Sequence, residues 1–485
     1  MRRILSGALA VATAATTLIP GAATAATPDT PRWGACPADA ALSGLECSTL
    51  QVPLDHRNPD GRKIEIAMSR LASKDPSKRR GVLLLNQGGP GGAGLGFVND
   101  LVSAGLPRSV LDAYDVIGFD PRGVGRSTPV TCGLTPEQQA RGNVPPYAAT
   151  AADVTKRAAE VKVIARQCAT SETAWMLPYV TTANTARDMD RIRQALGESK
   201  ISFLGYSYGS YLGAVYATLF PQRGDRIVID GNLPPSGLSF QDNDVFARGL
   251  EDRFPDFAAY AAAHPAYGLG DTPEEVTAKY FDLAGRLDKA PAEGVDGALF
   301  RMVTFGYLFR DAQMPTLAGL WQSLDTGQAP PSGAADDPVP DADNALSSHQ
   351  YVVSGDSRWP RSVRAYQRAV EADRKRYPMF GAAAANIRPC AYWPSDPVEP
   401  PVRIGDLGPS NVLMMQNLRD PGTPLTGARK LRRAFGDRAR MVTVDQGGHG
   451  AYLFGGNTCA NTAATTFLTT GQRPARDLTC AAQPS

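Results

Sequence analysis

The stretch Gly205-Tyr206-Ser207-Tyr208-Gly209 has the composition of a catalytic turn. It follows a short apolar run, residues 201–204, and precedes a helix-like run, residues 210–219. A serine at such a strand–turn–helix junction projects from the end of a sheet, and glycines two residues to either side let the backbone adopt the strained conformation. The pattern predicts a nucleophilic Ser207, with an ordinary loop as the alternative.

A serine hydroxyl needs a histidine base at neutral pH, and the histidine needs a carboxylate that fixes its tautomer and stabilises its charged form. In hydrolases with this turn the chain order is serine, acid, histidine. His449, in the run Gly447–Gly450, lies near the C-terminus and just past a predicted strand. We expect the remaining histidines to be solvated or core residues: His56, His264 and His349.

The acid should follow the strand before the histidine's strand, and Asp420 in the run Asn417–Pro424 has this position. An ordinary Asp-Pro turn is the alternative reading of this run. Asp230 is a second candidate, because it follows the strand after the serine turn and some hydrolases carry their acid there. We favour Asp420 as the acid.

The negative charge that develops on the substrate oxygen needs backbone N–H donors, and each donor contributes on the order of 10²- to 10³-fold in rate. The N–H of Tyr208, directly after the nucleophile, is the first predicted donor. The second should come from the glycine-rich loop 86–92, which follows a predicted strand, and Gly89 is the residue we choose.

Two glycine-rich segments invite other readings. Gly89-x-Gly91-x-x-Gly94 matches the dinucleotide-binding pattern, but Pro90 removes an N–H that a pyrophosphate would need. The run Asp120–Ser127 lacks the lysine of a phosphate-binding loop and is interpreted as a structural turn beside the active site. No C-x-x-C pair occurs and the histidines are scattered singly, so we expect neither a cofactor nor a metal.

The elements that position these residues alternate between strands and helices. A helical pattern covers residues 183–196 and ends at Gly197, directly before the strand that delivers Ser207. Such alternation predicts an α/β fold with a mostly parallel central sheet. Strands are expected at residues 48–52, 63–70, 81–85, 114–119, 201–204, 226–229, 411–416 and 441–444, and further helices at 210–219 and 425–435.

The alternation stops in the middle of the chain. From about residue 235 to 389 aromatic and alanine-rich segments with helical patterns dominate, and the strand–helix pattern then resumes. We therefore expect an inserted, largely helical lid. The predicted organisation is a signal peptide at residues 1–25, a first core part at 26–235, the lid at 236–389 and a second core part at 390–485.

Composition limits the setting in which the protein works. Residues 1–25 contain Arg2, Arg3, an apolar stretch and a small-residue site at Ala23–Ala25, which is typical of a secretory signal. Removal of the two arginines brings the formal net charge from +2 to zero, so nucleic acid is not an expected partner. No other segment is long and apolar enough to span a bilayer, so we expect a secreted, extracellular protein without a membrane anchor.

Seven cysteines follow the predicted signal, as suits an oxidising compartment. Their order suggests three local bridges and leaves Cys390 unpaired, although sequence alone does not determine the connectivity. The suggested bridges are Cys36–Cys47, Cys132–Cys168 and Cys459–Cys480.

Taken together, the segments 86–92, 120–127, 205–209, 420–424 and 447–450 resemble the secreted tripeptidyl aminopeptidases of actinobacteria. This group is similar to the proline iminopeptidases within the α/β-hydrolase fold, and the resemblance runs from about Trp33 to Cys480. It implies a serine exopeptidase that removes short N-terminal peptides, with Ser207, Asp420 and His449 as the triad. Proline iminopeptidases have a histidine where this loop has Gln87, so their single-residue specificity is not expected here.

An exopeptidase of this kind must bind a substrate with a free α-ammonium group, and a buried ammonium needs a carboxylate partner. The candidates are Asp230, near a strand end, and Glu251 and Asp252 in the first lid helix. Each is also consistent with a purely structural carboxylate. A secreted esterase or amidase of the same fold, acting on a non-peptide substrate, is the alternative function, since a fold does not fix a substrate.

Overall fold

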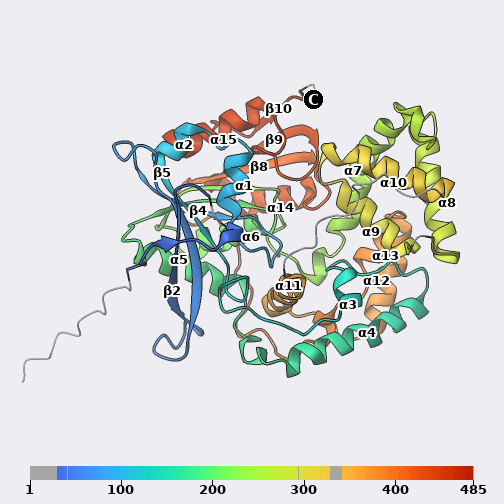
Figure 1. Cartoon of the computed structure of the whole chain (residues 1–485), viewed down its shortest axis with the longest axis horizontal. Coiled ribbons are helices and arrows are strands. Elements are labelled where there is room, and N and C mark those ends of the chain that lie inside the picture. The colour runs from blue at the N-terminus through green and yellow to red at the C-terminus, as the bar shows by residue number, and fades with distance from the viewer. Residues whose placement is uncertain (1–29, 41, 293, 328–340, 484–485) are drawn as a thin grey trace, which may run out of the picture.

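The computed structural model describes residues 30–40, 42–292, 294–327 and 341–483. The predicted signal peptide lies outside the described residues. Ten strands form one sheet in the order β1-β2-β3-β5-β4-β6-β7-β8-β9-β10 (Figure 1). The strands are β1 (Gly34–Ala35), β2 (Leu45–Pro53), β3 (Lys63–Leu71), β4 (Gly81–Asn86), β5 (Tyr114–Phe119), β6 (Ile201–Tyr206), β7 (Gly224–Asp230), β8 (Val412–Arg419), β9 (Ala439–Gly447) and β10 (Leu478–Cys480).

The sheet is parallel from β5 to β10, and only β1, β2 and β3 pair in the antiparallel sense. Every residue of β4 and β6 is buried, as expected for central parallel strands covered on both faces. The expected α/β-hydrolase fold is confirmed. All eight expected strands are present, and the short β1 and β10 at the two edges were not anticipated.

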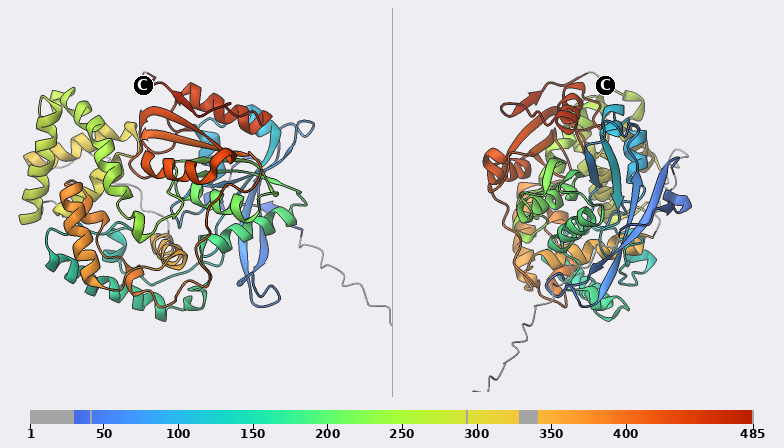
Figure 2. Two further views of the ribbon diagram at one scale, coloured as in Figure 1. Left: turned by 180° about the vertical axis from the view of Figure 1, so that it is seen from behind. Right: turned by 90° about the vertical axis from the view of Figure 1, so that its left-hand side faces the viewer.

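Helices cover both faces of the sheet (Figure 2). One face packs on α5 (Thr182–Ala195), α6 (Tyr208–Leu219) and α14 (Leu425–Phe435), whose apolar residues form one core with the strands. The other face packs on α1 (Phe97–Ser103), α2 (Arg108–Ala113) and α15 (Thr458–Thr470). The parallel strands end toward the same edge, so the loops that follow them can build one site.

A largely helical layer lies beside the sheet, on the right in Figure 1. Between β7 and β8 the described regular elements are helices: α7 (Val245–Ala262), α8 (Pro273–Lys289), α9 (Gly297–Tyr307), α10 (Met314–Thr326), α11 (Ala342–Asp356), α12 (Val363–Arg376) and α13 (Gly381–Ala384). We call the described residues from the start of α7 to the end of α13 the lid. Their composition agrees with the expected insertion, and its boundaries at 236 and 389 stay a prediction.

The sequence analysis did not anticipate that a second segment joins the lid. Helices α3 (Pro136–Ala140) and α4 (Ala151–Thr170) lie between β5 and α5, within the expected first core part. Val154, Ala158 and Val161 of α4 pack with Tyr366 and Val370 of α12 in a separate apolar cluster. The apolar stripe of α4 therefore faces the lid rather than the sheet.

Three disulfide bonds tie local segments together: Cys36–Cys47, Cys132–Cys168 and Cys459–Cys480. These are the three suggested pairs, and Cys390 is unpaired and buried. Among the described residues, none of the helices combines the length and apolar character that a membrane crossing would require.

Candidate active site

Ser207 occupies the sharp turn between β6 and α6. Its backbone has φ 58° and ψ −124°, an unfavourable conformation for a residue with a side chain. The N–H of Ser207 donates to the carbonyl oxygen of Asp230 at 2.8 Å, which fixes the turn against the end of β7. Strain of this kind, held by surrounding structure, is typical of a functional position.

The neighbouring glycines serve this turn by leaving space, and their own backbones are not left-handed. A methyl group on Gly205 would lie 2.5 Å from the carbonyl oxygen of Gly209. One on Gly209 would lie 2.7 Å from the carbonyl oxygen of Asn86. The structure agrees with the expected need for small neighbours: the strained dihedral angle belongs to Ser207, and the glycines allow β6, α6 and the loop after β4 to approach closely.

His449 and Asp420 are in direct contact. Nδ1 of His449 lies 2.9 Å from each carboxylate oxygen of Asp420. Asp420 is fully buried and also accepts hydrogen bonds from the N–H groups of Gly422 and Thr423, both at 2.9 Å, and from the Thr423 hydroxyl. These donors hold the carboxylate in place, as an acid that orients a histidine must be held.

The end of β7 connects this pair to the serine turn. Asp230, whose carbonyl holds Ser207, precedes Gly231, and a methyl group on Gly231 would lie 3.0 Å from Cε1 of His449. It would also lie 3.3 Å from Oδ2 of Asp420. Ser207, Asp420 and His449 are thus gathered around one short segment at the carboxyl ends of β6, β8 and β9.

The Asp420 carboxylate also controls the charge state of the imidazole. Burial lowers the pKa of His449, the adjacent Asp420 charge raises it, and the net shift is upward from the ordinary value. Asp230 adds to the upward shift, and the charge of Arg310 opposes it. His449 therefore gains basicity while it keeps a lone pair available on Nε2 in its neutral form.

Three anchors hold the loop that carries His449. The carboxylate of Asp230 accepts hydrogen bonds from the N–H groups of Ala451 and Tyr452, at 2.7–3.0 Å. The Asn417 side chain donates to the carbonyl oxygens of Gly448 and Gly450. The third anchor comes from the lid, because the carbonyl oxygen of Phe309 accepts the N–H of His449 at 2.8 Å, and its ring packs edge-on against the imidazole.

Asp230 is thus neither the acid that contacts His449 nor a carboxylate open to a substrate. It is fully buried, its oxygens are occupied by two backbone N–H groups, and burial raises its pKa to about 7. The two sequence-based assignments of Asp230 are corrected: it positions the histidine loop. Phe309, which also holds the histidine loop, left no signal in the sequence, because its contact with His449 joins residues 140 positions apart in the chain.

The predicted oxyanion loop lies against the serine turn. A methyl group on Gly88 would lie 2.8 Å from Cβ of Ser207 and 3.1 Å from the N atom of Tyr208. The N–H of Gly88 donates to Oδ1 of Asn86, whereas the N–H of Gly89 has no protein partner among the described residues. Tyr208 begins α6, where the first N–H groups of a helix have no partner within the helix.

The turn Asp120–Ser127 supports this loop. One oxygen of the buried Asp120 carboxylate accepts the N–H groups of Gly94 and Leu95, and the other accepts the N–H of Arg126. The Ser127 hydroxyl donates back to the carbonyl oxygen of Asp120 at 2.6 Å. The prediction of a structural turn is confirmed, and its function is to hold the segment that continues from Gly89.

The remaining histidines have other environments, as expected. His56 bonds to Asp188 at 2.8 Å, but the same carboxylate is shared with the fully buried Arg122, so the cluster is a structural ion pair. His264 stacks on Tyr260 at the surface. His349 is buried in α11, and burial together with the charge of Arg388 lowers its pKa to about 3, so it stays neutral.

The two other amine-binding candidates lie on helix α7. Oε1 of Glu251 accepts the N–H of Met379 within the lid, so this carboxylate already has a partner. Asp252 is half-buried and has neither a hydrogen bond nor an ion pair among the described residues. Burial raises the pKa of Asp252, and the charge of Arg248 opposes that rise.

The same helix touches the acid loop directly. A methyl group on Gly249 would lie 1.9 Å from the carbonyl oxygen of Pro421, the residue after Asp420. Nearby, Asp256 of α7 pairs with Arg419, the residue before Asp420. Residues 249, 252 and 256 share one side of α7 by helical spacing, so this side, with Asp252, faces the acid loop.

Gly249→Ala should separate α7 from the acid loop, because backbone cannot yield to a contact of 1.9 Å. We expect kcat/KM to fall by about tenfold or more and the free energy of unfolding to fall by about 1–3 kcal/mol. Gly285→Ala in α8 is the matched control, since nothing lies within 4 Å of that position and alanine favours a helix. Equal kinetics and equal stability for the two variants would contradict the close contact.

Comparison with known proteins shows the family of the chain. A family model described as TAP-like protein matches residues 377–480. The chain is 36% identical to a tripeptidyl aminopeptidase of Streptomyces lividans, over 93% of this chain and 86% of the relative.

Two relatives from Mycobacterium tuberculosis are also similar over most of their length. Serine protease Hip1 is 28% identical, with 90% of this chain and 87% of the relative covered. Carboxylesterase B is 30% identical, with 90% and 86% covered. The chain belongs to the tripeptidyl aminopeptidase family of serine hydrolases with the α/β-hydrolase fold.

Proposed function

We propose that the protein is a secreted serine exopeptidase that releases short N-terminal peptides, in the first instance tripeptides, through the triad Ser207, His449 and Asp420. The observation that carries this proposal is the contact of His449 with both oxygens of Asp420, next to a serine held at φ 58°. The named activity of the Streptomyces relative supports the tripeptide as the released unit.

The chemistry proceeds in two steps. Neutral His449 accepts the proton of the Ser207 hydroxyl as its oxygen attacks the scissile carbonyl carbon, and Asp420 stabilises the imidazolium that forms. The N–H groups of Tyr208 and Gly89 stabilise the oxyanion. His449 then protonates the leaving amine, and a water molecule, activated by the same histidine, releases the N-terminal fragment from Ser207.

Asp252 is our choice for the partner of the substrate's α-ammonium. It is half-buried, lacks a partner among the described residues, and lies on the side of α7 that contacts the acid loop. A carboxylate in this position would pair with the α-ammonium group of the substrate, which is withdrawn from water on binding. Removal of the carboxylate would leave this buried charge unpaired, which is costly. Glu251 and Asp230 already accept backbone N–H groups.

A tripeptide anilide with a free amine should be cleaved with a kcat/KM about 100-fold higher than its N-acetylated form, because acetylation removes the charge that Asp252 would bind. Asp252→Asn should lower kcat/KM for the free amine by about 30-fold or more and leave the acetylated substrate unchanged. Glu251→Gln, one residue away, is the matched control and should keep the preference. A preference that survives Asp252→Asn would overturn the assignment, and mass spectrometry of cleaved peptide mixtures would give the product length.

A second candidate function is esterase or non-peptide amidase activity with the same triad. One observation favours it: a relative that is 30% identical is named carboxylesterase B. The protein should turn over a short acyl ester more slowly than the tripeptide anilide with a free amine when both are measured under the same conditions. Equal or faster turnover of the ester would favour this second function.

The proposed extracellular location agrees with the three disulfide bonds, since such bonds persist in oxidising compartments. Cleavage after residue 25 remains part of the proposal. N-terminal sequencing of the protein recovered from the culture medium tests it directly.

A further inference from the structure

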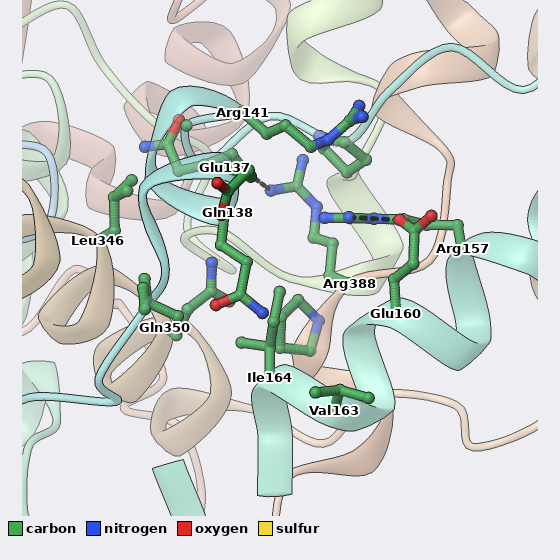
Figure 3. Close-up of a pocket in the computed structure, with 15 residues that line it drawn as sticks. Glu137, Gln138, Arg141, Arg157, Glu160, Val163, Ile164, Leu346, Gln350 and Arg388 are labelled. Carbon is green, nitrogen blue, oxygen red and sulfur yellow. Dashed lines mark hydrogen bonds and ion pairs between the residues drawn. The ribbon is translucent and has the colours of Figure 1, made fainter. Parts of the chain in front are cut away.

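A cavity of about 290 Å³ lies between α3, α4, α11 and the segment before Cys390 (Figure 3). Its walls are partly apolar and partly charged. The apolar lining includes Leu134, Pro145, Val163, Ile164 and Leu346. Three arginines, Arg141, Arg157 and Arg388, line the same space together with Glu137 and Glu160.

Among the described residues, the buried cation Arg388 has no anionic partner. Its side chain donates through Nη1 to the carbonyl oxygen of Asn143 at 3.1 Å, while Nε is buried and has no partner in the described part of the chain. No carboxylate among the described residues lies within ion-pair distance of its guanidinium. Burial lowers the pKa of Arg388, as expected for a charge that is poorly compensated.

Most other buried arginines of the described residues differ from Arg388 in this respect. Arg122, Arg253 and Arg301 each form an ion pair with an aspartate. Arg438 is also buried without an ion pair, and it donates to the carbonyl oxygens of Pro409 and Ala217. A buried charge without a partner is costly, so structural arginines are normally compensated by a carboxylate. Arg388 lacks this compensation and, unlike Arg438, lines the cavity described above, which is large enough for a small molecule.

Arg157 adds a second incompletely satisfied guanidinium. It bonds to Glu160 through Nη1 at 2.9 Å, and its Nε is buried without a partner. The positive charge of Arg157 lowers the pKa of Arg388, because two like charges in a poorly solvated space disfavour each other's charged form. Figure 3 shows Arg388 between Arg141 and the Arg157–Glu160 pair.

We propose that this cavity binds a small monocarboxylate with an apolar side chain, its carboxylate against Arg388 and Arg157 and its apolar part against Val163, Ile164 and Leu346. Planar guanidinium groups match the geometry of a carboxylate. Glu137 and Glu160 in the same lining disfavour anions of higher charge, and the apolar walls favour an organic ligand over an inorganic ion.

The site is distinct from the triad but adjoins the oxyanion loop through α11. Leu346 and Gln350 of α11 line the cavity. On another side of the helix, the carbonyl oxygen of Ala345 and the hydroxyl of Ser348 lie against Gly91, where a methyl group would approach them to 2.3 and 3.0 Å. An occupant of the cavity therefore contacts a helix that packs on the loop of Gly89.

The test is calorimetric titration of the whole protein with N-acetyl-leucine, hexanoate, N-acetyl-leucine amide and inorganic phosphate. We expect both carboxylates to bind and the amide and phosphate not to compete. Arg388→Gln should weaken binding by about tenfold or more, because it removes a charged donor. Since Arg388 is buried and this variant risks misfolding, Val163→Trp provides a second route: Val163 is 55% exposed, and the larger ring would fill the cavity from its solvent side.

Arg166→Gln is the matched control, since this exposed residue of α4 lies outside the cavity lining and the variant loses the same charge. Affinity for N-acetyl-leucine that is lost in Val163→Trp and kept in Arg166→Gln supports the site. Tighter binding of N-acetyl-leucine than of hexanoate would identify peptide ends as the natural source, and the reverse order would identify simple organic acids. Binding of the amide as tightly as the acid, displacement by phosphate, or full affinity in Val163→Trp would overturn the proposal.

Discussion

Ser207→Ala is expected to lower kcat by about 10⁶-fold, which is the scale of loss when a triad nucleophile is removed. The reason is local: the attacking oxygen disappears, while the backbone bond from Ser207 to Asp230 and the packing of Gly88 against the turn do not depend on the hydroxyl. Turnover is measured with the free tripeptide anilide, and circular dichroism checks that the fold is kept. Labelling by a fluorophosphonate should be lost in parallel.

Ser410→Ala is the matched control, because Ser410 is exposed and lies before β8, at the end of the sheet away from the site. It should keep the activity and the labelling. Ser207→Gly should be as inactive as Ser207→Ala but more stable by about 1 kcal/mol, since glycine tolerates φ 58°. Turnover of Ser207→Ala within about tenfold of the parent would refute the nucleophile.

The central strands and the turn that carries Ser207 could be predicted because each depends on local sequence. The apolar run at residues 201–204, the strained turn and the helix after it are contiguous, so one motif specifies all three. The strand β5 and the helix α14 were predicted with their observed bounds, 114–119 and 425–435. Asp420 and His449 each follow a strand, and parallel strands bring such positions to one edge of the sheet.

Contacts between distant segments could not be predicted in the same way. The apolar stripe of α4 indicates a buried side but not the partner, and the partner is α12 of the lid rather than the sheet. Phe309 reaches His449 across the fold, and nothing in its neighbourhood in the sequence marks it. Asp230 was considered as an acid because of its position after a strand, but only its bonds to Ala451 and Tyr452 reveal its role.

The amine site illustrates the same limit. Sequence placed Glu251 and Asp252 side by side, and no pattern separated them. In the structure they point to different sides of α7, so Glu251 bonds to Met379 and Asp252 remains unpaired. Helical geometry, which turns neighbouring residues by about 100°, makes this distinction only once the neighbours of the helix are known.

Asp420→Asn should lower kcat by about 10⁴-fold, because it would hold His449 in the wrong tautomer. The N–H groups of Gly422 and Thr423 both donate to Oδ1 of Asp420, so the carbonyl oxygen of an asparagine would stay there. Its NH₂ group would then face Nδ1 of His449 and donate to it. The proton of the imidazole would then be bound to Nε2 of His449. Nε2 could therefore no longer accept a proton from Ser207.

The pH dependence gives this variant a second, independent readout. In the parent protein the base must be neutral, so kcat/KM should fall as the pH drops through the pKa of His449, which lies above its ordinary value because of Asp420. Without the carboxylate charge, the midpoint of this fall should move to lower pH, while Asp437→Asn at an exposed position should leave both kcat and the midpoint unchanged. A normal midpoint in Asp420→Asn would mean that another group sets the charge of His449, and Asp230, the other buried carboxylate that raises the pKa of this imidazole, would then be the residue to replace.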